Sequence, residues 1–381
     1  MATSIQTESL TDLPRTFPLP AARISPKARP KKKLVRRIER DYSQIVRRTF
    51  QVVFLAWNVY LGGLFYSWVR HFETGATAQT PVRPPGVEGW LPIAGMMNFK
   101  YWLLTGHVAP VHPAAMFLLI TFVAISFLFR KAFCSWLCPI GTISEALARL
   151  GQKLFRHNFR LHRWIDIPLR GLKYLLLGFF VWAVSSMSAS AIASFMHSPY
   201  GVIADVKMLN FFRHLGEVGL IVLGVLVVAS IFVQNFWCRY LCPYGALLGL
   251  TSIFSPARIR RNPDACIDCA KCAKACPSSL PVDKLITIKS AECTGCLECV
   301  AVCPAQDALA LVLPVPAVER PQKLPVWAMA AGIAVLFVGI VGYAKTAGFW
   351  NTNVPRRVYM ELVPNADQAS HPMPGDPALN E

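Results

Sequence analysis

The chain has 381 residues and a formal charge of +18, from 39 Lys and Arg against 21 Asp and Glu. Hydrophobic residues make up 54% and charged residues 16%, whereas soluble globular domains have about 25% charged residues. This composition excludes a purely soluble protein and a largely disordered one, and twelve cysteines are too few for a dense disulfide scaffold. In so apolar a chain, the basic excess indicates loops beside membrane lipid, with no nucleic acid as partner.

The N-terminal segment, residues 1–48, is basic and rich in polar residues and proline. We predict that it is a disordered cytoplasmic arm and not a signal peptide, because no apolar core follows its charges. Five apolar stretches are long enough to cross a bilayer as helices, which takes about 17–25 residues. They cover residues 50–69, 113–129, 172–188, 215–236 and 325–344. A further apolar stretch, 89–106, contains Pro92, Asn98 and Lys100 and is interpreted as lying at the membrane surface.

The Lys and Arg residues alternate between the loops that join these stretches. Twelve precede the first stretch, three separate the first from the second, eight the second from the third, and two the third from the fourth. Positively charged loops stay on the cytoplasmic side of a bacterial inner membrane. The pattern therefore predicts a cytoplasmic N-terminus, a cytoplasmic segment at 256–313 and a short periplasmic tail at 345–381.

Eight cysteines form two copies of the motif C-x2-C-x2-C-x3-C-P. The copies are Cys266, Cys269, Cys272, Cys276 with Pro277, and Cys293, Cys296, Cys299, Cys303 with Pro304. This spacing is typical of bacterial ferredoxins with two [4Fe–4S] clusters, in which the fourth cysteine of each run binds the other cluster. The predicted ligand sets are Cys266, Cys269, Cys272 and Cys303 for one cluster, and Cys293, Cys296, Cys299 and Cys276 for the other. Paired cysteines can also bind zinc. Two complete copies of the motif, both ending in proline, disfavour a zinc site here.

The remaining cysteines form two C-x3-C-P pairs, each directly after an apolar stretch. They are Cys134 and Cys138 with Pro139, and Cys238 and Cys242 with Pro243. The copies are 104 residues apart (238 minus 134), which predicts an internal repeat of helix hairpins. Residues four apart share a helix face, so the four thiols could form one site for a third cluster or a soft metal ion. A dithiol relay, copper handling and buried structural thiols are the other interpretations.

Aromatic and histidine residues gather near the surface stretch. Trp102, His107 and His112 could form a quinol site, because such a site needs aromatic walls and a proton acceptor with a pKa near neutrality. The alternative is an aromatic belt at the membrane surface with two solvated histidines.

Over residues 42–304, the two C-x3-C-P hairpins and the two-cluster segment resemble membrane polyferredoxins of the NapH and NosR type. The copper-maturation proteins of the CcoG type share part of this pattern. The resemblance implies an inner-membrane electron-transfer protein that connects cytoplasmic clusters with the quinone pool or a periplasmic redox partner, as a quinol-dehydrogenase-type subunit would. The alternatives are a copper-handling assembly factor for a respiratory metalloenzyme and a redox-sensing regulator. Unlike the four-span NapH form, this chain has a fifth apolar stretch and a short tail.

The predicted fold is an all-α polytopic membrane bundle of five spans with an internal repeat. Its four-span part covers residues 49–255, and the fifth span is 325–344. Between them, 256–313 is predicted to form an inserted α+β ferredoxin domain of the bacterial two-cluster type.

Overall fold

The structure is a computed structural model that describes residues 34–38, 40–75, 81–156, 159, 161–313 and 322–372. Most of the predicted arm (1–33 and 39) and the end of the predicted tail (373–381) lie outside the described residues. The first part of the chain forms α1 (Ser43–Glu73), η1 (Pro85–Trp90), α2 (Pro92–Thr105), α3 (Pro113–Leu128), α4 (Ala132–Trp136), α5 (Pro139–Phe155), α6 (Arg163–Ser186), α7 (Ala189–His197), α8 (Pro199–Val202), α9 (Ala204–Arg213) and α10 (Glu217–Phe232). The rest forms η2 (Trp237–Leu241), α11 (Pro243–Ile253), β1 (Arg258–Arg261), α12 (Lys271–Ala275), α13 (Glu298–Ala301), β2 (Leu309–Leu313), β3 (Gln322–Lys323), α14 (Val326–Thr346), α15 (Arg356–Leu362) and η3 (Ala366–Gln368).

The described chain is mostly helical, as predicted, but it has fewer clear membrane spans than the five expected. Three helices are long and apolar enough to cross a membrane, namely α1, α6 and α14. A fourth span results only if α9 and α10, which are bent by 81°, count together. The expected span 113–129 is α3, whose 16 residues extend about 24 Å at 1.5 Å per residue, less than a hydrocarbon core of about 30 Å. Apolar sequence alone does not distinguish a span from a helix enclosed by protein.

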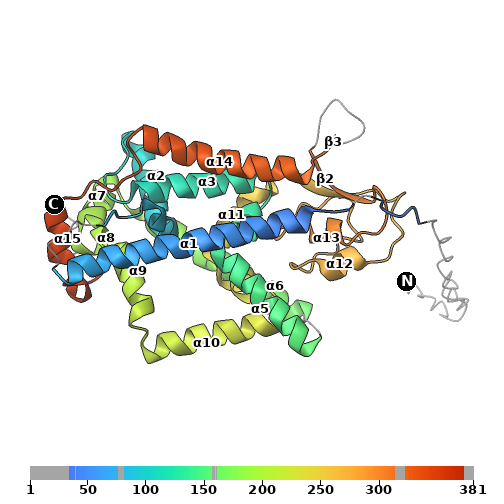
Figure 1. Cartoon of the computed structure of the whole chain (residues 1–381), viewed down its shortest axis with the longest axis horizontal. Helices are drawn as coiled ribbons and strands as arrows, with labels where there is room; N and C mark the ends of the chain where they lie inside the picture. Colours follow the sequence, from blue (N-terminus) through green and yellow to red (C-terminus); the bar gives the residue numbers. More distant parts are fainter. Residues whose placement is uncertain are drawn as a thin grey trace, which may run out of the picture. The chain divides into compact units, whose positions relative to one another are not determined.

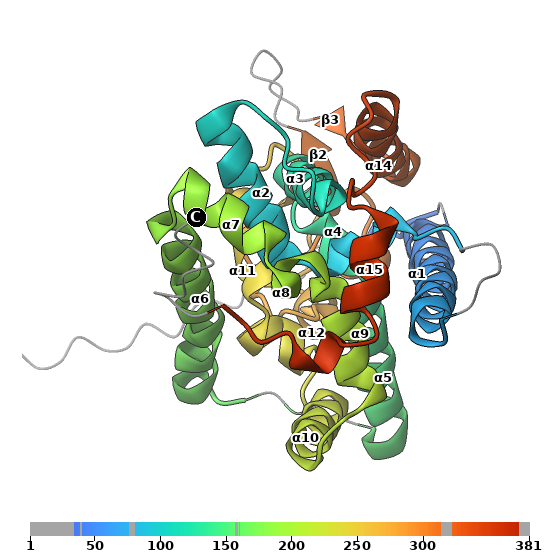
Figure 2. The ribbon, with the colours of Figure 1, turned by 90° about the vertical axis from the view of Figure 1, so that its left-hand side faces the viewer.

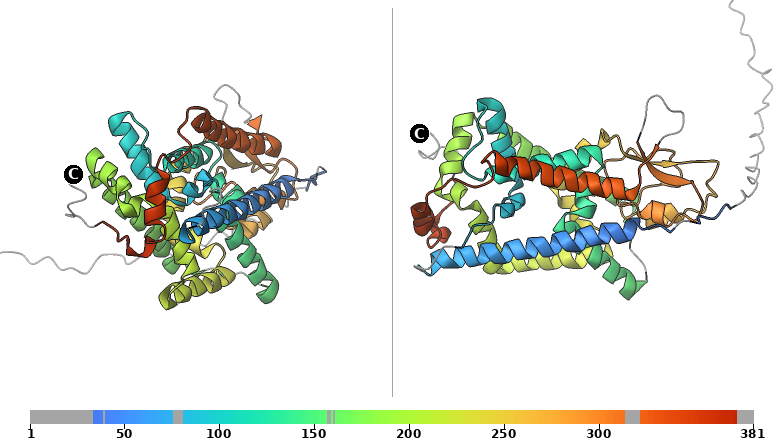
Figure 3. Two further views of the ribbon diagram at one scale, coloured as in Figure 1. Left: turned by 60° about the vertical axis from the view of Figure 1, so that its left-hand side comes forward. Right: turned by 45° about the horizontal axis from the view of Figure 1, so that its top comes forward.

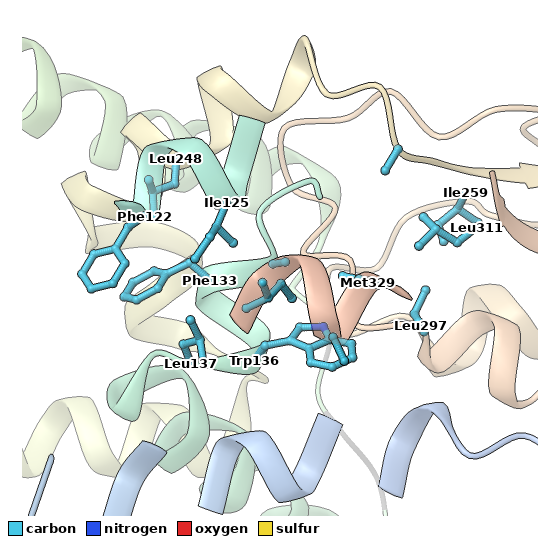
Figure 4. Packing of buried hydrophobic residues seen from close by; sticks show 14 of the residues in the cluster. Phe122, Ile125, Phe133, Trp136, Leu137, Leu248, Ile259, Leu297, Leu311 and Met329 are labelled. Carbon is cyan, nitrogen blue, oxygen red and sulfur yellow. The ribbon is translucent and has the colours of Figure 1, made fainter. Parts of the chain in front are cut away.

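Helix α3 is enclosed in this way, at the centre of the other helices. Most of its side chains are buried, and it packs against α2, α11 and α14. Phe122 of α3 stacks on Phe133, with ring centroids 3.9 Å apart. The same buried cluster continues through Trp136 to Leu297 and Leu311 (Figure 4). One hydrophobic core therefore joins the helices to the cysteine-rich segment.

The cysteine-rich segment contains a three-stranded sheet in the order β1–β2–β3, with α12 and α13 beside it. The strands are antiparallel, and Ile259 of β1 lies opposite Leu311 of β2. Strand β3 leads into α14, and Arg36, ahead of α1, forms a β-bridge with Ala305. These elements lie at one end of the long helices, and α7, α8 and α15 lie at the opposite end (Figures 1 and 3).

Short helices close the opposite end (Figure 2), and charged side chains form a buried ionic cluster there. Arg83 pairs with Glu88 at 2.8 Å and with Asp205 at 2.6 Å. Thr352, in the chain after α14, donates a hydrogen bond to Glu88 at 2.7 Å. Burial alone would raise the pKa of Glu88, but Arg83 and a hydrogen bond from His112 lower it to about 2. The cluster therefore ties η1, α9 and the C-terminal part of the chain together.

Candidate metal centres

The two C-x2-C-x2-C loops have the same backbone conformation. In the first loop, Asp268 and Ala270 have φ angles of 55° and 55°, and in the second loop Gly295 and Leu297, at the same positions, have 62° and 60°. Residues other than glycine rarely adopt positive φ. Left-handed residues among right-handed ones turn successive backbone N–H groups to one side, and such a nest binds the anionic sulfur atoms of iron–sulfur clusters. The loops therefore fit iron–sulfur clusters.

Electrostatic interactions sort the eight thiols of these loops into two groups. The first group contains Cys266, Cys269, Cys272 and Cys303. The second group contains Cys276, Cys293, Cys296 and Cys299. Cys299 also interacts with Cys272, which indicates that the groups are neighbours. Burial raises the pKa of Cys296 to about 12, whereas Cys269 is exposed. The ligand sets predicted from the motif have the same members and stay a prediction.

Each C-x3-C-P pair lies at a junction between two helices. Cys138 and Cys242 are the N-cap residues of α5 and α11, with extended backbone and proline next in the chain. The amide of Cys138 donates to the carbonyl of Phe133 at 2.9 Å, and that of Cys242 donates to Trp237 at 3.0 Å, each five residues back. The sulfur of Cys242 accepts a hydrogen bond from the amide of Gly245 at 3.2 Å. Both second cysteines are thus at helix N-termini, where the helix dipole favours a thiolate.

The four thiols of these pairs lie in one half-buried region, which we call the four-thiol site. Cys138 interacts electrostatically with Cys134 and Cys242, and Cys238 interacts with all three. Burial raises the pKa of Cys134 to about 11 and that of Cys138 to about 12. Tyr244 is half-buried next to three of the thiols, and loss of contact with water raises its pKa as well. The four thiols are therefore half-buried and lie close enough together to affect one another electrostatically.

Two lysines and a carboxylate border the four-thiol site. Lys131 is 4% exposed and interacts electrostatically with Cys134, Cys242 and Cys238. Glu292 pairs with the buried amine of Lys173 at 2.5 Å. Burial alone would raise the pKa of Glu292, but the charges of Lys131 and Lys173 lower it. A charged network thus reaches from the four thiols to the residue before Cys293.

Hydrogen bonds fasten the four-thiol site to the second C-x2-C-x2-C loop. The hydroxyl of Ser135 donates to the carbonyl of Thr294 at 2.6 Å, and the indole N–H of Trp136 donates to the next carbonyl at 3.2 Å. Ser135 directly follows Cys134, and Thr294 directly follows Cys293. We call these two hydrogen bonds the clamp, and they hold cysteine-bearing segments of both regions side by side.

A cavity of about 410 Å³ lies between the two regions. Cys134 and Cys238 line it from the four-thiol site, and Cys296 lines it from the ferredoxin loop. Its other walls carry charged side chains, among them Arg47 and Glu145. Thiols from both predicted kinds of site therefore face one polar space.

Comparison with known proteins gives two families and several relatives. A family described as a 4Fe-4S binding domain matches residues 111–159 and 215–262, and one described as a 4Fe-4S dicluster domain matches residues 258–304. YccM of Escherichia coli, named for a proposed role in electron transport, is 51% identical over 326 residues, which is 85% of this chain and 91% of YccM. The ferredoxin-type protein NapH of Escherichia coli is 24% identical over 237 residues, 61% of this chain and 74% of NapH. The regulatory protein NosR of Pseudomonas aeruginosa is 30% identical over 199 residues, 49% of this chain and 26% of NosR. No solved structure matches the chain.

The match to YccM extends over most of both proteins and decides the family. The chain belongs to the family of NapH- and NosR-type membrane ferredoxins. It is an iron–sulfur membrane protein of electron transport, which confirms the resemblance and the cofactor type predicted from the cysteine motifs. The two matches of the first family begin 104 residues apart (215 minus 111) and contain the two C-x3-C-P pairs.

The structure separates the three residues that were predicted to bind quinol. Trp102 and His107 are exposed, and the ring of His107 contacts the carbonyl of Thr105 at 2.9 Å. His112 is fully buried, with one ring nitrogen 3.4 Å from Glu88 and the other 3.0 Å from the carbonyl of Gly201. Within the described ranges, no hydrogen bond or ring contact joins His112 to the other two. This membrane ferredoxin therefore uses His112 in the ionic cluster, and the quinol site stays a prediction.

Several charged residues near the metal centres were missed by sequence reasoning. Lys131 and Lys173 were counted as loop and span-end charges, and Glu292 had no assigned role. Arg47, counted with the N-terminal cations, is 1% exposed and pairs with Glu145 at 2.8 Å and with Glu298 at 2.7 Å. Their positions in the sequence could have indicated a role near the metal centres. Each of these residues lies within a few residues of a cysteine motif or at the end of a predicted span.

Proposed function

We propose that the protein carries single electrons between a cytoplasmic redox partner and either quinone or a periplasmic redox protein, in a bacterial inner membrane. The eight ferredoxin cysteines hold two [4Fe–4S] clusters, and the four-thiol site holds a third. Each cluster supplies a centre that takes up or releases one electron. The distribution of Lys and Arg supports a cytoplasmic position for the N-terminus and the ferredoxin segment and a periplasmic C-terminus.

The clamp is the observation that carries this proposal. Ser135 and Thr294 are hydrogen-bonded at 2.6 Å, and each is adjacent in sequence to a predicted cluster ligand. The shared hydrophobic core around Trp136 and Leu297 keeps the two segments together. An electron carrier has to hold its two cysteine sites close together, because electrons pass between them. A protein that only assembled metal centres would not need such a fixed contact.

The surroundings of the four-thiol site support an anionic centre such as a [4Fe–4S] cluster, which four cysteine thiolates bind. Two helix N-termini and the cation of Lys131 add positive charge beside the thiols. Four thiolates need such charge in a half-buried site.

Quinone is included because the clamp holds the two cysteine regions together, and the ferredoxin segment lies at one end of the long helices (Figure 1). A hydrocarbon core is about 30 Å thick, so a mobile carrier or a partner has to take the electrons farther. Trp102 and His107, which are exposed, stay the proposed place for quinol on the opposite side, whereas His112 is buried in the ionic cluster.

The test is the iron content and quinol-driven cluster reduction of Cys138→Ser, Cys242→Ser and the double variant. We expect about twelve iron atoms in the wild type and about eight in all three variants, because loss of one ligand already disrupts a shared site. Reduction of the remaining clusters by a quinol analogue in membranes should be lost. Thr142→Ala, which removes a hydroxyl that donates to the carbonyl of Cys138, is the matched control and should behave as the wild type.

Other outcomes would point to the rival functions. Full iron and full reduction in the double variant would refute the role of the four-thiol site. Normal cluster reduction, together with loss of copper from a copper enzyme of the same cell, would identify copper handling. Lower membrane abundance with normal activity per protein would show that the thiols are structural.

A further inference from the structure

Lys131 is a buried cation that lies beside Glu292 and three of the four thiols. It is 4% exposed, and among the described residues no carboxylate forms an ion pair with its amine. A β-carbon added to Gly245 would lie 3.5 Å from the amine of Lys131 and 3.5 Å from the sulfur of Cys242. The amine and that sulfur are therefore within about 7 Å of each other, twice that distance.

The neighbouring charges leave one positive charge in excess. Glu292 is the nearby carboxylate, but it is paired with Lys173 at 2.5 Å and accepts a hydrogen bond from Tyr174 at 3.3 Å. Lys131, Lys173 and Glu292 together carry two positive charges and one negative charge. A buried charge without compensation is strongly unfavourable, so the network calls for an anion on the side of Lys131 that faces the four thiols.

We propose that Lys131 is the counter-charge of the four-thiol site and that it sets the reduction potential of the cluster held there. The inference rests on the proposed third cluster and adds the residue that tunes it. Four thiolates outweigh the positive charge of a cubane, so the site is anionic and becomes more so on reduction. A fixed cation close to it favours the reduced form and raises the potential.

The cavity offers a matched control for this role. Arg149 also lines the cavity, but its side chain is 40% exposed and it pairs with Glu145. Water and salt screen an exposed cation, whereas they screen a buried one much less. Arg149→Gln should therefore leave the potential of the third cluster almost unchanged, and the effect of Lys131 should persist at high salt.

The experiment compares Lys131→Met, Lys131→Arg and Arg149→Gln in the purified full-length protein. Iron per protein is measured first, and each cluster is then titrated electrochemically with detection by electron paramagnetic resonance. In Lys131→Met we expect the reduction equilibrium of one cluster to become at least tenfold less favourable, a shift of 59 mV or more to lower potential for a one-electron centre. In Lys131→Arg and Arg149→Gln, the potential of this cluster should shift by less than 59 mV. The two ferredoxin clusters should keep their signals in all variants.

A fourth variant keeps the inference testable if Lys131→Met does not accumulate. Glu292→Gln removes the negative charge of the network, so it should shift the potential of the same cluster upward. An unchanged potential in Lys131→Met, a downward shift in Glu292→Gln, or equal effects of Lys131→Met and Lys131→Arg would overturn the inference. The absence of a third cluster shows separately, as equal iron content in the wild type and Cys138→Ser, and that result would refute the proposed function itself.

Discussion

Replacing Arg47 with methionine should loosen the ferredoxin segment from the helices. The guanidinium of Arg47 is 1% exposed, pairs in bidentate fashion with Glu145 at 2.8 Å and also pairs with Glu298 at 2.7 Å. It therefore links α1 with α5 and α13. Methionine keeps much of the length of the side chain and removes the charge, so Glu145, with a side chain 15% exposed, loses its buried partner.

The expected loss is about 3 kcal/mol in the free energy of unfolding, because breaking a buried ion pair costs about 3–5 kcal/mol. The lower end applies because Glu145 keeps Gln51 and Arg149 as partners. Urea unfolding in detergent, followed by tryptophan fluorescence, gives the free energy from the midpoint and slope of the transition. Arg48→Met changes an exposed neighbour and should stay within about 0.5 kcal/mol of the wild type.

A double-mutant cycle separates the ion pair from general packing. Arg47→Met combined with Glu145→Met should cost about 1–3 kcal/mol less than the sum of the single changes, because neither charge is then left alone. A loss below about 1 kcal/mol in Arg47→Met, or a coupling near zero, would refute the reasoning.

Two further predictions concern other parts of the protein. A β-carbon at Gly151 would lie 2.0 Å from the carbonyl oxygen of Ile231, whereas one at Gly171 meets nothing within 4 Å. Gly151→Ala should therefore destabilise the packing of α5 on α10 by about 1–3 kcal/mol. Gly171→Ala should stabilise the protein slightly, because alanine has a higher helix propensity than glycine. Equal unfolding midpoints of the two variants would contradict this prediction. The pKa of Glu88 is about 2, below its ordinary 4.5, so its ionised form adds stability above pH 4.5 that is lost as the pH falls toward 2. The gap in unfolding temperature between the wild type and Glu88→Gln should shrink between about pH 5 and pH 2, and a constant gap would disprove the assigned role.

The elements and the cofactor type could be predicted because they depend on local sequence. Apolar length places α1, α6 and α14, and the cysteine spacing alone indicates ferredoxin loops. The five spans stay a prediction, because α3 is enclosed by other helices and the predicted span 215–236 contains an α10 of only 16 residues. Hydropathy measures how apolar a segment is, and both lipid and protein can surround such a segment.

The charged residues around the metal centres could not be predicted from the sequence for a different reason. Lys131 and Glu292 are 161 residues apart in sequence (292 minus 131), and only the fold brings them to one site. The same holds for Ser135 and Thr294, whose hydrogen bond depends on the docking of two segments. A single sequence contains the residue types of such contacts but not their pairing.

The attachment of the ferredoxin segment has a consequence for how partners reach it. A swinging-arm carrier visits donor and acceptor in turn and needs a hinge that opens at little cost. Here β1 follows α11, β3 leads into α14, and Arg36 bridges to Ala305; opening would also expose Leu297 and Leu311 to water. Under the proposed function, the segment therefore stays in place, and its redox partner has to come to it. The loop with the exposed Cys269 is the surface that we propose for this contact.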